Sequence, residues 1–470
     1  MSKKSLKRIM VLLLAVVFSV SILSACGNKK TTEEATSSTK EETSSNMATQ
    51  PTETKQKEEK VIELRFSTTS TTSSADFAEL NAAIEKFMAE NTNIKIVKDS
   101  VDSQTWRTKS SVEFSSDNAP SISWSPLNYA IQFMKDDLII DWSKVYSDPN
   151  HPEFKTWFSD TIRNFSDYGD GRLMLCPSVM SIDGLFYNSE LFEKNGWQVP
   201  KTVDDVIALA EKCNKAGIAT MVTGGKDVRY AWMAAAIMSR TCGIDNMKYL
   251  ATGDGLLQWD NPKYGFPQAM ETFKKMCDAG VFPKDTNGLS ASEADQLFVR
   301  EEAAMYYEGQ WKISNWKALG GANFINKVKR IDFPAITGMS VPPNTRVGGT
   351  VTGYVISKKQ SPEEIEACIK FVKAIVSPEY YKPLVEKGNL YAGNMDLSKM
   401  KLDSVTKELV DAFLTAESMV GSNDAAFLHP SIDMAIKKTA MPGLIDKSLN
   451  IDAAIAEVKK AAESVHSSSK

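Results

Sequence analysis

Tryptophans near the ends of short predicted strands are the residues of this sequence best suited to hold a ligand. Trp124 follows a strand-like run and precedes Ser125-Pro126, and Trp311 follows another such run and the turn 308–310. In α/β folds, ligands bind beyond the carboxyl ends of strands. A flat ring placed there can stack on the C–H face of a sugar, while nearby polar groups bind its hydroxyls. Trp232 is a third candidate of this kind. For any one of the three tryptophans, the alternative to ligand stacking is that the ring fills the core.

Residues arranged for catalysis are missing from the sequence. It has no G-x-x-x-x-G-K-[ST], G-x-G-x-x-G, H-E-x-x-H or G-x-S-x-G motif. The three histidines are His151, His429 and His466, and none has a catalytic motif around it. His429 fits a surface loop better than a cleft. Residues 167–171 lack the alternating acidic positions and terminal Glu of a calcium loop, so we expect a turn. We therefore predict no enzyme, no cofactor and no metal site.

The N-terminus carries an export signal. Four basic residues within the first eight positions precede the apolar run 9–20, and residues 23–27 read Leu-Ser-Ala-Cys-Gly. This order is similar to the lipobox of bacterial lipoproteins, whose cysteine carries the lipid. The prediction is a signal peptide over 1–25, lipidation of Cys26 and a disordered tether over 26–60, rich in Thr, Ser, Glu and Lys. An ordinary signal peptide with a chance cysteine is the alternative.

Charge and length limit the function of the remaining chain. Lys and Arg number 55 and Asp and Glu 59, and loss of the four basic signal residues leaves a net charge of −8. This balance argues against a nucleic-acid partner. About 400 residues from Val61 onward suggest two domains or one bilobed domain.

Five cysteines follow the signal, with no C-x-x-C pair among them. We expect small buried hydrophobic residues rather than metal ligands. A disulfide between Cys213 and Cys242 stays open as an alternative.

Strands and helices alternate along the chain. Strand-like runs cover 61–66, 94–97 and 218–222, and the helices between them carry recognisable ends. Thr202 begins a capping-box pattern, Pro267 begins a helix that stops at Gly280, and Ser361-Pro362 begins another. Alternating β and α segments predict an α/β fold with mainly parallel sheets flanked by helices.

Several motifs in order resemble the family 1 extracellular solute-binding proteins, the carbohydrate-binding group that includes maltose-binding protein. The most specific segments are Gly171–Pro177 followed by Leu185–Gly196, Tyr307–Trp311, and Gly348-Gly349 followed by Val355–Lys358. The resemblance implies a two-lobed, class II periplasmic-binding-protein-like fold with a hinge between the lobes. It places residues 61–180 and 351–394 in lobe one, and residues 181–350 and 395–470 in lobe two.

The same resemblance implies the function and the site. We expect a lipid-anchored, monomeric component of an ABC importer, which captures a sugar by lobe closure outside the membrane and delivers it to the transmembrane permease subunits. The implied ligand-binding residues are Trp124, Asp183, Trp232, Trp311, Glu308, Thr68, Thr69 and Gly349.

Other ligands and one other activity fit the sequence less well. The wider family that the sequence resembles also captures glycerol phosphodiesters, polyamines and metal chelates. An anionic ligand would call for basic residues at the cleft, such as Arg107, Arg229 or Arg346. A lipid-anchored hydrolase would use Asp183 and Glu308 as paired carboxylates.

Overall fold

The computed structural model describes residues 61–74, 76–339, 345–349, 352–416, 418–421 and 428–468. The expected signal peptide, the lipid-bearing Cys26 and the tether lie outside the described residues. Among the helices within these ranges, none combines the length and the apolar character that a membrane crossing needs.

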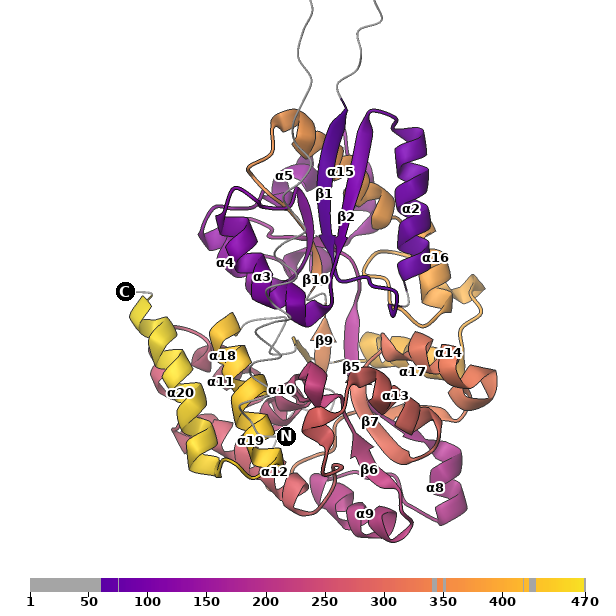
Figure 1. The fold of residues 1–470 in the computed structure, drawn as a ribbon, viewed down its shortest axis with the longest axis vertical. Helices are drawn as coiled ribbons and strands as arrows, with labels where there is room; N and C mark the ends of the chain where they lie inside the picture. Colours follow the sequence, from indigo (N-terminus) through magenta and orange to yellow (C-terminus); the bar gives the residue numbers. More distant parts are fainter. Residues whose placement is uncertain are drawn as a thin grey trace, which may run out of the picture. The chain divides into compact units, whose positions relative to one another are not determined.

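One sheet has the strand order β2-β1-β3-β10-β4, and Figure 1 labels β1, β2 and β10 of it. Its strands are β1 (Ile62–Thr68), β2 (Ile94–Ser100), β3 (Ile122–Pro126), β4 (Cys176–Pro177) and β10 (Thr352–Ile356). The helices and turns that go with it are α2 (Phe77–Glu90), α3 (Ser103–Ser115), α4 (Leu127–Lys135), α5 (Trp142–Ser147), α6 (Pro152–Trp157), α7 (Asp160–Asn164), α15 (Pro362–Ile375), α16 (Pro378–Glu386) and η5 (Leu397–Lys399). We call this part lobe one.

The second sheet has the order β11-β9-β5-β7-β6, with β8 also paired to β5. Its strands are β5 (Ser181–Asn188), β6 (Ala219–Val222), β7 (Ala303–Gly309), β8 (Val328–Ile331), β9 (Thr345–Gly349) and β11 (Ser418–Val420). The helices that go with it are α8 (Ser189–Asn195), α9 (Val203–Lys215), η1 (Gly225–Asp227), α10 (Tyr230–Thr241), α11 (Gly243–Leu250), η2 (Gly253–Leu257), η3 (Pro262–Tyr264), α12 (Phe266–Asp278), η4 (Thr286–Gly288), α13 (Ala291–Val299), α14 (Lys312–Ile325), α17 (Ser404–Leu414), α18 (Pro430–Ala435), the π-helical η6 (Ile436–Ala440), α19 (Met441–Ile445) and α20 (Ile451–Ser468). This part is lobe two.

Local chemistry explains where several helices begin. Thr202 caps α9 in a reciprocal capping box with Asp205, and Ser361 caps α15 in the same way with Glu364. The side chain of Ser377 caps α16, whose first residue is a proline. The helix starts at Thr202 and Ser361 lie where the sequence predicts them.

The α/β fold class is confirmed, and its sheets are mixed. The pairs β1·β2, β1·β3, β6·β7 and β9·β11 are parallel, whereas β10 and β5 run antiparallel to their neighbours. Both β5 and β10 begin just after the chain has passed from the other sheet. They therefore start at the edge where the parallel strands end, and run in the opposite direction.

Two predicted strand ends need correction. The strand expected to stop before Trp124 continues through it to Pro126, and the strand expected to stop at Tyr307 includes Glu308 and Gly309. Both extensions are stabilised by ladder pairing, because Trp124 pairs with Tyr354 and Glu308 pairs with Gly184. Such partners are far away in the sequence, so local pattern alone did not reveal them.

The described elements locate three passages of the chain between the two sheets. Residues 178–180 lead from β4 to β5, two residues separate β9 from β10, and a third passage lies between Leu402 and α17. Leu402 packs against the core of lobe one, whereas Val405 of α17 belongs to a core of lobe two.

Candidate ligand-binding site

The strand ends that carry the predicted site residues share one edge in each sheet. In lobe one, Thr352 at the start of β10 pairs with Pro126 at the end of β3, which runs parallel to β1. In lobe two, Asp183 near the start of β5 pairs with Gly309 at the end of β7. Gly349, at the end of β9, is only three residues before Thr352, a span of at most about 11 Å. The topology therefore brings the two edges close together.

Exposure separates the predicted tryptophans from most of the others. Five of the nine are buried, with four of them fully enclosed: Trp106, Trp142, Trp197, Trp259 and Trp316. Trp124, Trp232 and Trp311 are each partly exposed, as is Trp157 on α6. An indole left partly in water at a strand end is available for stacking, whereas the enclosed ones serve the core.

The lobe-one edge holds Trp124 on a rigid support. Its ring meets the ring of Trp106 edge-on, with centroids 5.2 Å apart, and Trp106 donates from Nε1 to Ser123 Oγ at 3.0 Å. Thr68, at the end of β1, is buried, and its Oγ1 accepts a hydrogen bond from the backbone N–H of Ser70 at 3.2 Å. Thr69 is partly exposed. Of the two threonines, Thr69 is the more accessible to a ligand.

The lobe-two edge carries an aromatic platform made of Trp232 and Trp311. Trp232 lies in the first turn of α10 and Trp311 immediately before α14. Their ring centroids are 5.7 Å apart, with an interplanar angle of 56°. The Trp311 ring covers Gly309, where an added Cβ would come within 2.2 Å of it. The Nε1 of Trp311 is buried and has no hydrogen-bond partner among the described residues.

Glu308 lies beneath this platform and is fully buried. Its Oε1 is 3.8 Å from Nε of Arg229, and neither atom has a hydrogen bond within the described part of the chain. Burial raises the pKa of Glu308, against the opposing effect of Arg229 and Lys312. Lys312 in turn forms a buried ion pair with Asp295, Nζ to Oδ2 at 2.8 Å.

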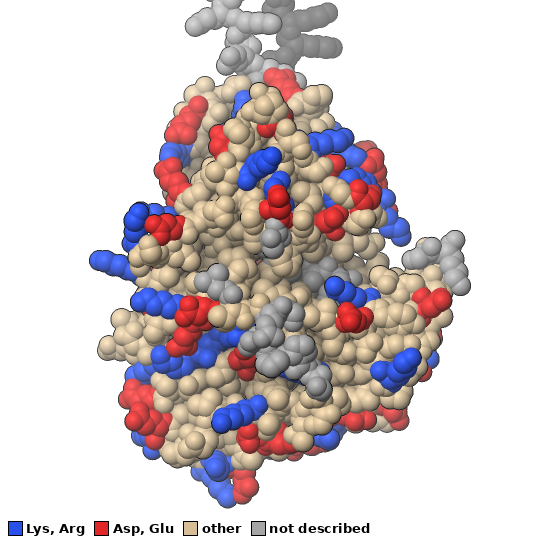
Figure 2. Space-filling model, turned by 180° about the vertical axis from the view of Figure 1, so that it is seen from behind, with Lys and Arg blue, Asp and Glu red and all other residues tan. Residues whose placement is uncertain are grey.

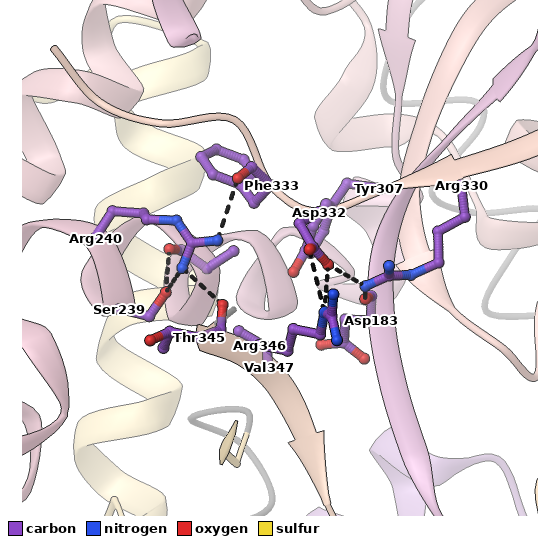
Figure 3. Close-up of a pocket in the computed structure, with 11 residues that line it drawn as sticks. Asp183, Ser239, Arg240, Tyr307, Arg330, Asp332, Phe333, Thr345, Arg346 and Val347 are labelled. Atoms are coloured by element: carbon purple, nitrogen blue, oxygen red, sulfur yellow. Dashed lines mark hydrogen bonds and ion pairs between the residues drawn. The ribbon is translucent and has the colours of Figure 1, made fainter. Parts of the chain in front are cut away.

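Asp183 belongs to a network of charged side chains rather than to an open surface (Figure 3). It is 3% exposed and lines a cavity of about 10 Å³, room for no more than one water molecule. Its backbone carbonyl accepts from Arg330, which also pairs with Asp332 at 2.7 Å. Arg346 bonds the same carboxylate at 3.0 and 3.1 Å. Burial alone would raise the pKa of Asp332, but these two arginines hold it below the ordinary value.

Gly349 lies at the point where lobe two meets lobe one. Its φ of +113° is unfavourable for other residues, and a Cβ there would lie 2.9 Å from the ring of Phe165. Phe165 follows α7 in lobe one. This glycine therefore has a structural reason to be present, whatever it contributes to ligand binding.

A larger cavity, of about 600 Å³, is lined from both lobes. Lobe one contributes α4, including Asn128 and Lys135, and lobe two contributes His429 and the end of α20. Asn128 donates from its side chain to the backbone carbonyl of Leu428 at 3.2 Å, which joins the lobes directly. His429, expected in a surface loop, thus lines a cavity between the lobes, where burial and Lys135 lower its pKa.

Each of the three arginines considered for an anionic ligand has a partner within the protein, Glu308 and the Trp232 ring in the case of Arg229. Arg346 is held by Asp332 and by the carbonyl of Ala412, and Arg107 is buried with its guanidinium 5.9 Å from the Tyr129 ring centroid. On the face seen in Figure 2, basic and acidic side chains are interspersed rather than gathered by sign. Neither observation favours a strongly anionic ligand.

Cysteine and metal chemistry have little support in the described residues. All five cysteines there are free thiols, so the alternative Cys213–Cys242 disulfide is absent. Burial raises the pKa of Cys242 to about 12. Among the residues whose placement is described, no group of three His, Cys, Asp or Glu side chains is arranged to hold a metal ion.

The sequence did not indicate how Arg229, Arg330 and Asp332 would be used. The spacing Arg330-x-Asp332, with Arg330 in β8 and Asp332 immediately after its last residue, is a usable signal for a pair of opposite charges. The pairing of Arg229 with Glu308 leaves no comparable trace, because 79 positions separate them.

Two lobes that each present a partly exposed aromatic edge, joined by short passages of the chain, define a two-lobed solute-binding protein. The family described as bacterial extracellular solute-binding protein matches residues 82–408, and the chain belongs to it. The resemblance seen in the sequence is therefore confirmed.

Individual relatives are distant. A probable sugar-binding periplasmic protein of Rhizobium meliloti (strain 1021) is 23% identical over 350 residues, 71% of this chain and 79% of the relative. Among solved structures, a chitin oligosaccharide binding protein superposes with a TM-score of 0.77 at 19% identity, covering 87% of this chain and 99% of its own. A sugar transporter from Bacillus licheniformis in complex with stachyose superposes with a TM-score of 0.67 at 15% identity, covering 85% of this chain and 98% of its own. At these identities the structural matches establish the two-lobed fold.

Proposed function

We propose that this protein is the substrate-binding component of an ABC importer and captures a neutral sugar or oligosaccharide outside the cytoplasmic membrane. A lipid on Cys26 would hold it at the membrane, and the permease would receive the sugar from the closed form. The protein itself would act as a monomer and would catalyse no reaction.

The observation that carries the proposal is the partial exposure of Trp124, Trp232 and Trp311 at the two adjoining sheet edges. Sugars bind proteins through such rings and through polar groups around them. The names of the relatives point to the same ligand class, since the Rhizobium protein is called sugar-binding and the two solved structures concern chitin oligosaccharides and stachyose.

Burial of the predicted carboxylates argues against the other readings. Asp183 is 3% exposed and surrounded by arginines, and Glu308 is fully enclosed beside Arg229. A hydrolase needs two carboxyl groups open to the scissile bond. A polyamine receptor likewise needs accessible carboxylates, so a neutral polyhydroxylated ligand fits this site better.

Lobe closure would couple binding to delivery. A ligand that touches both sheet edges only in the closed form stabilises that form by its extra contacts. Conversion from mostly open to mostly closed needs about 5 kcal/mol of differential affinity. Three stacked rings and several hydrogen bonds can supply this amount.

Calorimetric titration of the chain from residue 27 onward tests the proposal. The panel would contain N,N′-diacetylchitobiose, chitotriose, stachyose, D-galactose, D-galacturonate, glycerol 3-phosphate and spermidine. We expect at least one neutral saccharide to bind at micromolar or lower concentration. Binding of only an anion or of spermidine would refute the sugar proposal, and hydrolysis of any saccharide would refute the non-enzymatic role.

A further inference from the structure

The side chain of Arg229 lies against the Trp232 ring of the aromatic platform and pairs with buried Glu308, yet part of it remains exposed. Its guanidinium carbon is 4.9 Å from the centroid of the Trp232 ring, in cation–π contact. No hydrogen bond joins its guanidinium to any of the described residues, and 22% of the side chain is exposed. A guanidinium with five donors in that situation can bind a ligand that approaches the platform.

The only carboxylate within ion-pair distance of Arg229, among the described residues, is Glu308. The two meet through Nε and Oε1 at 3.8 Å, and that edge of the guanidinium faces the protein interior. The two terminal nitrogens lie further along the side chain and are not among the buried unpaired atoms, in contrast to Nε. The arginine is therefore anchored on its inner edge and free on its outer edge.

We propose that Arg229 is a specificity-determining residue of the sugar site: its terminal nitrogens donate to neighbouring hydroxyls of a neutral sugar ring seated on Trp311, and buried Glu308 positions it. The inference rests on the proposed function and assigns the hydroxyl-binding group on lobe two. Glu308 itself does not touch the ligand and is a positioning residue.

Charge favours hydroxyls over a carboxylate at this point. The Glu308 carboxylate lies directly behind the guanidinium and compensates its charge. An anionic sugar would place a second negative charge near the first in a weakly solvated setting, which is unfavourable. Hydroxyl groups accept the same N–H donors without that repulsion.

The test combines a substitution in the protein with the removal of one hydroxyl from the sugar, in the manner of a double-mutant cycle. The sugars are the saccharide that binds most tightly in the panel above and its monodeoxy analogues. Arg229→Gln should weaken binding of the parent sugar about 10- to 100-fold, as expected for lost charge-assisted hydrogen bonds. For the analogue that lacks a contacted hydroxyl, the same substitution should change the affinity less than threefold.

Glu308→Gln keeps the shape of the side chain but removes the anchoring charge. We expect Glu308→Gln to weaken binding of the parent sugar and to change the affinity for the deoxy sugar little. The preference for the parent over the deoxy sugar should therefore decrease. A purely structural role would weaken both sugars equally. Arg229→Lys should recover part of the affinity and none of the two-hydroxyl selectivity, because an ammonium lacks the planar fork.

Arg172 offers a matched control in lobe one. Its guanidinium carbon lies 4.8 Å from the Tyr168 ring centroid and it pairs with Asp170 at 2.7 Å, an arrangement like that of Arg229, Trp232 and Glu308. Arg172→Gln should leave sugar affinity unchanged, and circular dichroism and thermal melting confirm the folding of every variant.

The outcomes separate the two claims. If the wild type binds no neutral saccharide, the proposed function fails. If it binds one and Arg229→Gln retains wild-type affinity, or weakens parent and deoxy sugars alike, the assignment of Arg229 is wrong while the function stands. Tighter binding of D-galacturonate than of D-galactose by the wild type would also overturn it.

Discussion

At the scale of single residues, the structure divides tryptophans and carboxylates by what surrounds them. Trp311 is partly exposed above Gly309, whereas Trp316, only five positions later, is fully buried and donates from Nε1 to Asp295 at 3.0 Å. The same residue type is therefore accessible to a ligand in one place and part of the core in the other. Substitution effects should follow this division.

Trp311→Ala should weaken binding of the panel sugar about 10- to 100-fold, because both the stacking and the burial of the sugar face are lost. Stability should change little, since the ring is not part of a core cluster. Calorimetry and urea titration measure the two effects. Tyr249→Ala is the control: Tyr249 lies on α11, is 38% exposed, and its ring centroid is 4.7 Å from that of Tyr264 on η3. Equal losses in the two variants would contradict the role of Trp311.

The buried carboxyl of Glu308 should give stability a recognisable pH dependence. Since its pKa is raised in the fold, the native state holds this proton more tightly than the unfolded state does. The contribution is complete below the ordinary value of 4.5 and is lost as pH rises through the folded pKa. Glu308→Gln lacks it, so its stability relative to the wild type should increase as pH rises above 4.5.

Asp332→Asn provides the opposite sign as a control. The pKa of Asp332 is lowered in the fold, so its contribution is present above 3.8 and disappears as pH falls through the folded pKa. The stability of this variant relative to the wild type should therefore increase as pH falls below 3.8. Urea midpoints between pH 3 and 8 measure both variants, and parallel curves would show that neither carboxyl is perturbed as described.

At the scale of elements, the sequence predicts helix ends better than strand ends. Capping boxes and glycines mark the helix ends, whereas the strands have no comparable local signal. The helix starts at Thr202 and Ser361 depend on neighbours three residues away, which the sequence displays. The strand end at Glu308 depends on Gly184, and the charged network around Asp183 joins residues from α10, β5 and β9. Contacts over such separations leave no local pattern, so the nature of the Asp183 and Glu308 environments could not be predicted.

The passage between β9 and β10 should be sensitive to added bulk at Gly349. Gly349→Ala combines an unfavourable φ with a contact to Phe165, and we expect a loss of about 1–3 kcal/mol from the backbone alone. Gly169→Ala is the matched control, because its φ of +102° is similar while no atom lies within 4 Å of the added Cβ. Urea denaturation should show the larger loss at Gly349, and equal losses would mean that the Phe165 contact has no effect.

At the scale of the whole molecule, several hydrogen bonds tie the two lobes together. One of these is the hydrogen bond from Asn128 to the carbonyl of Leu428. A cavity of about 600 Å³ lined from α4 on one side and from α11, His429 and α20 on the other must change volume if the lobes move. Small-angle scattering can follow such a change in solution.

Addition of a saturating neutral saccharide should lower the radius of gyration of the chain from residue 27 onward, because ligand contacts to both lobes favour the closed form. Trp124→Ala removes the proposed aromatic contact of lobe one, and Trp311→Ala removes one of the two in lobe two. Each substitution should raise the saccharide concentration needed for compaction in proportion to its loss of affinity. The Tyr249→Ala variant should become compact at the same saccharide concentration as the wild type. If saturated protein keeps the radius of the free protein, the sugar binds to one lobe only, and delivery to a permease could not depend on closure.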